Sequence, residues 1–145
     1  YEGFQAAMTQ AGLAIDPGLI QQGYFTYRSG LEATEKLLAR KSPPPAIFAS
    51  NDDMAAGAVS VAHRRGLDVP RDLSVVGYDD TPIATTVWPE LTTIRQPIAA
   101  MAGSAIELLL RSIRLRKDGE ARVVSDHVMA HVLIKRDSVA APRKS

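Results

Sequence analysis

The amino-acid sequence predicts an α/β protein with a parallel sheet, and three observations support that fold class. "AIFAS" at 46–50 is a short, continuously apolar run, and "LSVVGYDD" at 73–80 begins with a similar run. Such runs are typical of strands that are buried on both faces of a sheet. A helical pattern separates them, and alternating strands and helices are typical of parallel sheets. A chain of 145 residues fits one domain with room for a core.

A helix and a strand are expected in the first 25 residues. Apolar residues recur at helical spacing before Gly12, where the helix is expected to stop: Phe4, Ala7, Met8 and Ala11. "DPG" at 16–18 is a turn signal, and "LIQQGYF" at 19–25 has the composition of a short strand.

Two helices are expected on either side of the first buried strand. Ser29 is a candidate cap for a helix from 30 to about 40, and the prolines of "KSPPP" at 41–45 end it because they cannot continue a helix. The next helix is expected to stop at Gly66, and its apolar stripe consists of Met54, Ala58, Val61 and Ala62.

The C-terminal part has a different pattern. A helix that starts at Ile98 is apolar almost all round, which predicts burial on more than one face. "KDGE" at 117–120 is a turn signal, "HVLIK" at 131–135 is the last expected strand, and residues 139–145 form a tail.

Composition and charge are those of an ordinary soluble globular protein. The formal net charge of +1 gives no bulk reason to expect nucleic-acid binding through this segment. The absence of Cys excludes a disulfide framework, a thiolate metal site and a Cys nucleophile. There is no signal peptide and no apolar run of about 18 residues, so neither secretion nor membrane insertion is predicted, and cytoplasmic residence is expected.

Polar residues follow both buried strands at the point where each ends. Ligands of open parallel sheets bind beyond the carboxyl ends of the strands, and the clusters at 50–53 and 78–80 lie there, as does Phe25. Carboxylates and an amide exchange hydrogen bonds with vicinal hydroxyls, while an aromatic face packs on ring C–H groups. This rim therefore suits a small, sugar-like ligand.

Purely structural roles for the same residues stay open. Asp52 or Asn51 is a candidate helix cap, and capping is the expected main task of Asp52. Asp79 and Asp80 are of the type that stabilises turns. A single aromatic residue such as Phe25 is more often part of a core than a stacking platform.

Catalytic and metal-binding interpretations have weaker support. Neither a nucleophile elbow nor a Walker-type motif is present, so no enzyme and no cofactor are expected. A Mg²⁺-dependent phosphoacceptor site needs a lysine at a later strand end, where this chain has Arg95. His127 and His131 are too far apart on an extended segment to share a metal ion. The basic residues of "RSIRLRK", Arg111, Arg114 and Lys117 among them, suit a solvated helix end.

Several segments together resemble the LacI/GalR family of transcriptional regulators, in the effector-binding part with the periplasmic-binding-protein type I fold. The matching stretches are "AIFASNDDMAAGAVSVAHRRGLDVPRDLSVVGYDD" at 46–80, "PELTTIRQP" at 89–97 and "LIKRDS" at 133–138. Weaker agreement is found in "YEGFQAAMTQAG" and "GYFTYRSGLEATEKLL". The order and spacing hold over nearly the whole chain, from 1 to about 138.

The resemblance implies particular effector-binding residues. In such regulators the Asn of the Asn-Asp corner hydrogen-bonds the effector, which here is Asn51, and the residue two further on, Asp53, faces the pocket. The first Asp after the Gly-aromatic pair, Asp79, binds effector hydroxyls. Asp52 is then left to serve the helix.

The resemblance also implies contacts from neighbouring segments and a division of the chain. Phe25 packs against the ligand, and Ile98 and Met101 are less direct contacts. A family Arg upstream of "YEGF", most of the N-terminal lobe and the helix-turn-helix lie outside this chain, so the second lobe is expected to be incomplete. The expected parts are mainly the C-terminal lobe at 1–97, a helix returning to the other lobe at 98–121, the last crossover and strand at 122–138, and the tail at 139–145.

The implied mechanism is allosteric. An effector in the cleft between the lobes selects one lobe orientation, and a homodimer transmits it to operator DNA through the DNA-binding domain. The dimer face is expected to include the helix beginning near Met54 and the segment around Val87 and Trp88. A periplasmic sugar receptor of a transport system has the same fold and is the competing interpretation.

Overall fold

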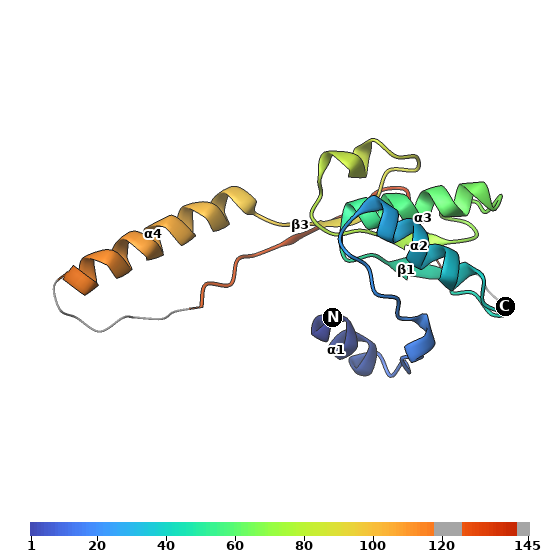
Figure 1. The fold of residues 1–145 in the computed structure, drawn as a ribbon, viewed down its shortest axis with the longest axis horizontal. Coiled ribbons are helices and arrows are strands. Elements are labelled where there is room, and N and C mark those ends of the chain that lie inside the picture. Colours follow the sequence, from blue (N-terminus) through green and yellow to red (C-terminus); the bar gives the residue numbers. More distant parts are fainter. Residues whose placement is uncertain (118–125, 142–145) are drawn as a thin grey trace.

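The computed structural model describes residues 1–117 and 126–141. The elements (Figure 1) follow in the order α1 (Glu2–Gln10), η1 (Pro17–Leu19), α2 (Tyr27–Leu38), β1 (Ala46–Phe48), α3 (Asp52–Arg64), β2 (Ser74–Val76), η2 (Pro82–Thr85), β3 (Thr93–Arg95), α4 (Ile98–Lys117) and β4 (Val132–Ile134). The alternation of helices and strands confirms the predicted α/β class.

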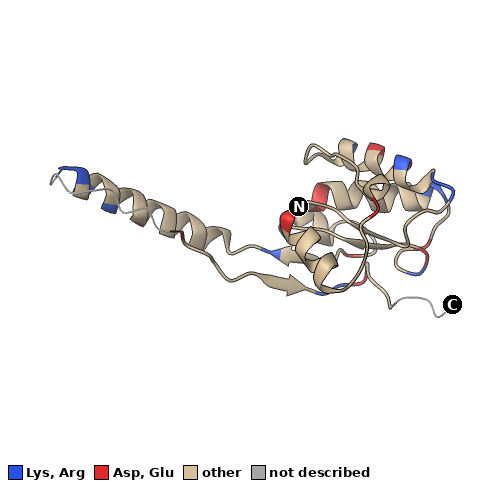
Figure 2. Ribbon diagram, turned by 90° about the horizontal axis from the view of Figure 1, so that it is seen from below, with Lys and Arg blue, Asp and Glu red and all other residues tan. Residues whose placement is uncertain are grey.

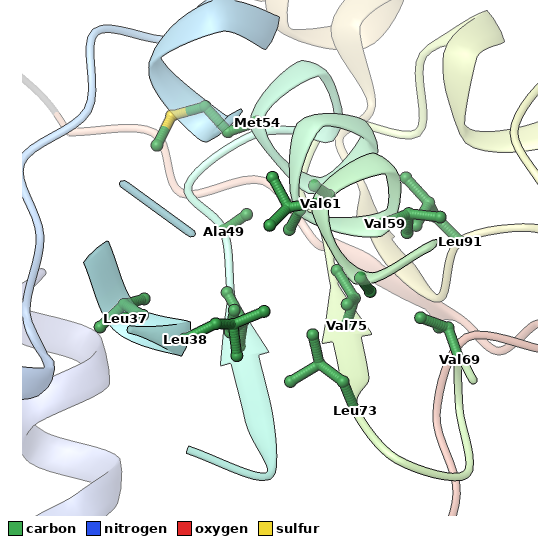
Figure 3. Close-up of a cluster of buried hydrophobic side chains, with 14 of the residues drawn as sticks. Leu37, Leu38, Ala49, Met54, Val59, Val61, Val69, Leu73, Val75 and Leu91 are labelled. Carbon is green, nitrogen blue, oxygen red and sulfur yellow. The ribbon is translucent and has the colours of Figure 1, made fainter. Parts of the chain in front are cut away.

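The body of the molecule is built around a parallel pair of strands. β1 and β2 pair in parallel with Ile47 opposite Val75, and helix α3 packs on this pair while α2 packs on α3. One cluster of buried apolar side chains fills the space between these elements (Figure 3); its members include Leu37, Leu38, Val59, Val61, Leu73, Val75 and Leu91. The expected core stripe of α3 is confirmed, because Met54, Ala58, Val61 and Ala62 are all buried.

A second pair of strands, β3 and β4, lies beside β2. β3 and β4 are antiparallel, with Ile94 opposite Leu133. The chain just before β3 lies beside β2, since Val76 and Thr92 form a parallel bridge and the N–H of Gly77 donates to the carbonyl of Thr92 at 2.9 Å. β3 therefore lies next to the end of β2, where the expected binding rim is located.

Helix α4 stands away from the α/β body at the far end of the β3–β4 ribbon (Figure 1). None of its residues is buried, although Ile106, Leu109 and Leu110 are large and apolar. Its basic residues gather at the tip (Figure 2), where Arg114 and Lys117 lie in the last turn and complement the negative end of the helix dipole. Over the described residues, no helix has the length and apolar character needed to cross a membrane.

Two predicted elements differ from those in the structure. Residues 19–25 do not form a strand: 17–19 are a short 3-10 helix and 20–25 are irregular, because no described segment offers this stretch a hydrogen-bonding ladder. Helix α2 begins at Tyr27 and not at Gly30. Thr26 is its N-cap, while Ser29 is the third helical residue and completes a capping box.

The remaining differences concern element ends. The strands expected at 46–50, 73–80 and 131–135 are each reduced to three residues. Helix α4 runs to Lys117, which was expected to belong to a turn. The rest of that expected turn, 118–120, and part of the expected crossover and tail lie outside the described residues.

Candidate functional site

Asn51 organises the corner between β1 and α3. It is the N-cap of α3: its Oδ1 accepts from the N–H of Met54 at 2.9 Å. Its Nδ2 donates to the carbonyl of Phe25 at 3.1 Å, which ties the loop before α2 to this corner. The side chain is buried, with 8% exposed, and within the described part of the chain only one of its two amide hydrogens has an acceptor.

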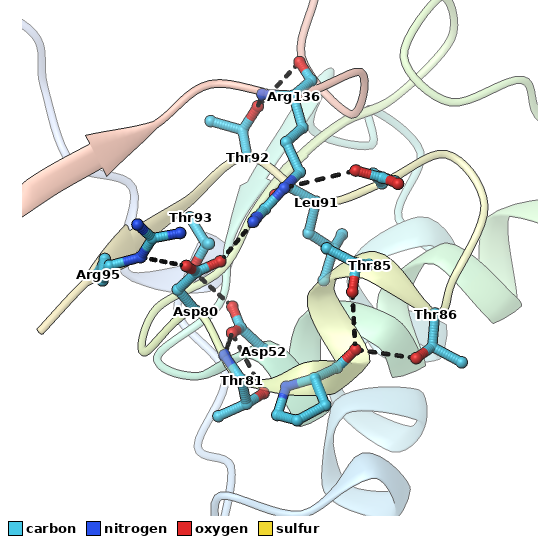
Figure 4. A network of polar contacts seen from close by, with 12 residues as sticks. Asp52, Asp80, Thr81, Thr85, Thr86, Leu91, Thr92, Thr93, Arg95 and Arg136 are labelled. Carbon is cyan, nitrogen blue, oxygen red and sulfur yellow. Dashed lines mark hydrogen bonds and ion pairs between the residues drawn. The ribbon is translucent and has the colours of Figure 1, made fainter. Parts of the chain in front are cut away.

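Asp52 does not cap the helix, so that prediction was wrong. Its fully buried carboxylate accepts from the N–H of Thr81 at 2.7 Å, from the Thr81 hydroxyl at 3.3 Å and from the Thr93 hydroxyl at 2.6 Å (Figure 4). These bonds join α3 to the loop after β2 and to β3. Gly77 is required beside it, since a Cβ at that position would collide with Asp52 Oδ1. The preceding residue, Asn51, takes the capping position because its backbone has the extended conformation that an N-cap needs.

Asp79 and Asp80 make a strained turn in the loop after β2. Their φ angles are 110° and 58°, in the region that side chains rarely adopt. The N–H of Asp79 donates to the carbonyl of Ile94 at 2.9 Å. The Asp80 carboxylate pairs with Arg95 Nε at 2.5 Å and with Arg136 Nη2 at 2.7 Å (Figure 4). The strain is thus balanced by contacts with β3 and with the chain after β4.

The Asp80 carboxylate is held in its ionised form. Only 6% of its side chain is exposed. Burial by itself raises the pKa of Asp80, but hydrogen bonds from Arg136 and Arg95, together with their positive charges, outweigh burial and place the pKa below its ordinary value. Asp80 is therefore an anchor of the loop and not a proton donor.

Asp79 is in a different environment. It is half-buried, and its Oδ1 accepts from Gln96 Nε2 at 2.6 Å. Among the described residues, Oδ2 has no hydrogen-bond partner and the carboxylate has no ion pair. One negatively charged acceptor is thus left free at the sheet edge.

The other predicted site residues lie around this edge. Phe25 is 66% exposed, also has a positive φ (57°), and is joined to Asn51 as described. Asp53 is half-exposed in the first turn of α3. Ile98 and Met101 are exposed in the first turn of α4, just beyond β3. Since β1 and β2 are parallel neighbours, the corners after them lie at one edge of the sheet.

The carboxylates of the two corners bear on the Mg²⁺ alternative. Both oxygens of Asp52 and both of Asp80 already accept hydrogen bonds, so a hard cation would have to displace those donors.

The two histidines weighed as metal ligands lie near the end of the chain. His131 lies on the non-helical stretch before β4. His127 Nδ1 lies 3.1 Å from the Ser104 hydroxyl.

Three residues of the site were missed by sequence reasoning. Gln96 and Thr93 belong to the quoted "PELTTIRQP", and Arg136 to the quoted "LIKRDS", but none was assigned a role. Their partners are distant in sequence: Gln96 pairs with a residue 17 positions away, Thr93 with one 41 away and Arg136 with one 56 away. The sequence offers one signal for Gln96 and Thr93: "PELTTIRQP" lies at the end of an extended segment, from where its side chains could reach the rim.

The fold is that of periplasmic-binding-protein-like domains, α/β with parallel strands. The chain belongs to this family: the family model described as "Periplasmic binding protein-like domain" matches residues 1–139.

Relatives place the chain beside transcriptional regulators. It is 42% identical over 110 residues to catabolite control protein A of Priestia megaterium, covering 76% of this chain and 33% of that protein. The transcriptional regulator CelR in complex with cellobiose has a similar structure, with a TM-score of 0.84 at 35% identity, covering 94% of this chain and 40% of that one. A sugar-binding regulator of the LacI family from Escherichia coli, complexed with phosphate, gives a TM-score of 0.79 at 37% identity, covering 97% and 49%. This confirms the resemblance drawn from the motifs. The chain spans about a third of the length of the first curated relative.

Proposed function

We propose that this chain is the effector-sensing part of a transcriptional regulator and that its effector is a sugar or a related hydroxylated small molecule. The observation that carries the proposal is the Asp79 carboxylate: among the described residues its Oδ2 has no partner and no cation pairs with it, and the same sheet edge presents an exposed aromatic ring, Phe25. Acceptor-rich edges with an apolar ring suit vicinal hydroxyls and ring C–H groups. A structural neighbour bound to cellobiose supports this ligand class.

The residues take distinct parts in that proposal. Asp79 Oδ2 accepts from an effector hydroxyl, and the remaining amide hydrogen of Asn51 donates to an effector oxygen. Asp53, half-exposed in the first turn of α3, supplies a second acceptor. The Phe25 ring packs on the sugar. Ile98 and Met101 give less direct, apolar contact from the first turn of α4, beyond β3.

The proposed mechanism is allosteric and not catalytic. The effector acts only through its different affinities for two lobe orientations. A homodimer with a DNA-binding domain outside this chain transmits the change to operator DNA. Because the operator DNA is in the cytoplasm, the proposed location of the whole protein is the cytoplasm. The proposed dimer face includes the segment 87–88. Trp88 is 75% exposed in the single chain and is therefore accessible to a second subunit.

Relatives and contacts weigh against the two alternatives. The curated relatives include transcriptional repressors and regulators, which favours a regulator over a transport receptor. Against Mg²⁺-dependent phosphoacceptor chemistry, the oxygens of Asp52 and Asp80 are already engaged.

The exposed apolar helix supports the proposed division into lobes. Ile106 and Leu109 are about 60% exposed, as expected if helix α4 packs in the whole protein against a lobe whose larger part lies outside these 145 residues. A cleft between two lobes draws contacts from both, so the 145 residues alone should bind sugar at least tenfold more weakly than the polypeptide with its upstream sequence. Equal affinities for the two, measured by calorimetry, would contradict this division.

DNA binding tests the regulator proposal directly. The upstream-extended polypeptide is incubated with a labelled fragment of its own promoter region, with and without sugars such as cellobiose, and the complex is followed by gel shift. A complex whose affinity changes with one sugar is the expected result. No DNA complex under any condition, together with tight sugar binding, would favour the transport receptor.

A further inference from the structure

Gln96 is the last residue before Pro97 and helix α4, and its side-chain amide donates to Asp79 Oδ1 at 2.6 Å. We propose that Gln96 is a positioning residue that holds the Asp79 carboxylate so that Oδ2 is presented to a hydroxyl of the effector. The inference rests on the proposed function, since it presupposes that Asp79 receives the effector.

The Asp79 backbone is fixed by other contacts, which leaves the side chain as the part that needs positioning. Its N–H donates to the carbonyl of Ile94, and a parallel bridge joins it to Arg95. A half-buried carboxylate on this backbone still has its own rotamer freedom. The Gln96 hydrogen bond selects one orientation before the effector arrives, which lowers the entropic cost of binding.

The chemistry of the donor also matters. Asp80 is paired with two guanidinium groups, from Arg95 and Arg136. Asp79 receives a neutral amide instead, so its negative charge is not compensated by a described cation. An ionised acceptor makes stronger hydrogen bonds than a neutral one, so Asp79 is the carboxylate of this turn that is suited to bind hydroxyls.

Gln96 also joins Asp79 to the start of helix α4. Its backbone carbonyl accepts from the N–H of Ile98, the first residue of α4, at 3.0 Å. One residue thus contacts the proposed effector-binding carboxylate through its side chain and the start of α4 through its backbone.

A double-mutant cycle tests the proposal. Dissociation constants are measured by calorimetry on the upstream-extended polypeptide with cellobiose, glucose, galactose and ribose. Gln96→Met keeps the side-chain length and removes the donor, and it should weaken binding of the recognised sugar about tenfold. In an Asp79→Ala background the same change should have less than about a twofold effect, because no carboxylate remains to be positioned. Gln10→Met, on the exposed face of α1, is the matched control and should leave the dissociation constant unchanged.

The outcomes separate the two proposals. Unchanged affinity in Gln96→Met, or an equal loss in both backgrounds, would overturn the positioning role while the sugar site stands. If none of the sugars binds the wild-type protein, the proposed sugar ligand is wrong, and the positioning of Asp79 for a sugar hydroxyl is overturned with it.

A second measurement does not depend on the folding of the Gln96 variant. In the sugar-free protein, the Gln96 side-chain amide protons should resonate apart from those of exposed glutamines and return among them in Asp79→Ala. The same chemical shift in both proteins would show that the Gln96–Asp79 bond does not form, which would overturn the proposal.

Discussion

The Thr93 hydroxyl donates to the carboxylate of Asp52 at 2.6 Å, and both side chains are fully buried although they are 41 residues apart in the sequence. The same carboxylate accepts from the Thr81 N–H. One side chain therefore fixes the relative positions of α3, the loop after β2 and β3, the segments that carry the proposed binding rim.

Removing the Asp52 carboxylate should destabilise the fold strongly. Asp52→Ala leaves the buried Thr93 hydroxyl and the Thr81 N–H without an acceptor, and we expect a loss of about 3 kcal/mol in the free energy of unfolding. Asp53→Ala is the matched control at the next position, and it should cost less than about 1 kcal/mol because this side chain is half-exposed and acts mainly on the helix dipole. Urea denaturation measures both, and equal losses would show that the buried network is not what holds the corner.

The two functions of the Asn51 amide can be separated by substitution. Asn51→Asp keeps an acceptor for the Met54 N–H but loses the donor to the Phe25 carbonyl, so the stability of α3 should be retained. Asn51→Ala loses both bonds and should cost about 1 kcal/mol more. Both variants should lose sugar affinity, since each removes the amide hydrogens. Wild-type affinity in Asn51→Asp would mean that the amide does not donate to the effector.

Acid should weaken the fold partly through Asp80. Because the pKa of Asp80 in the folded protein lies below its usual value, the ion pairs with Arg136 and Arg95 contribute stability that is fully present above about pH 4, the range of the unfolded carboxyl group. That contribution is lost as the pH falls through the lower folded-state pKa. Asp80→Asn should therefore be less stable than wild type at pH 6, and the difference should shrink toward pH 2. A difference that stays constant over this range would contradict the assignment.

Trp88 should matter for assembly more than for folding. Its side chain is 75% exposed, so Trp88→Arg should change the free energy of unfolding of the monomer by less than about 1 kcal/mol. In the upstream-extended polypeptide it should raise the dimer dissociation constant at least tenfold, because a charge replaces the aromatic side chain that the proposed interface covers. Sedimentation velocity gives the measurement. A dimer of unchanged strength would place the interface elsewhere.

The sequence was a good guide to the elements that carry their own local signals. The stripe in α3, the prolines after α2 and the apolar character of β1 are local features, and the structure confirms the helices and the parallel pairing they predict. The segment 19–25 also has strand composition, but an extended stretch becomes a strand only when a neighbour pairs with it, and the described chain provides none.

The site was harder to predict because its contacts are long-range. Two adjacent polar residues, Asn51 and Asp52, both have side chains able to cap a helix. Backbone conformation selects Asn51, while the hydroxyl of Thr93 engages Asp52. Neither fact is visible in the residue types. The residues assigned to effector contact, Asp79 foremost, remain predictions.

A thermal-shift screen of the upstream-extended polypeptide tests whether a sugar binds at Asp79. Sugars, sugar phosphates and nucleosides are compared with Mg²⁺ alone, in the wild-type protein and in Asp79→Ala. We expect a rise in Tm with one sugar class that disappears in Asp79→Ala, while the Tm of the ligand-free variant stays close to that of wild type. A rise with Mg²⁺ alone, or a sugar response that survives in Asp79→Ala, would contradict it.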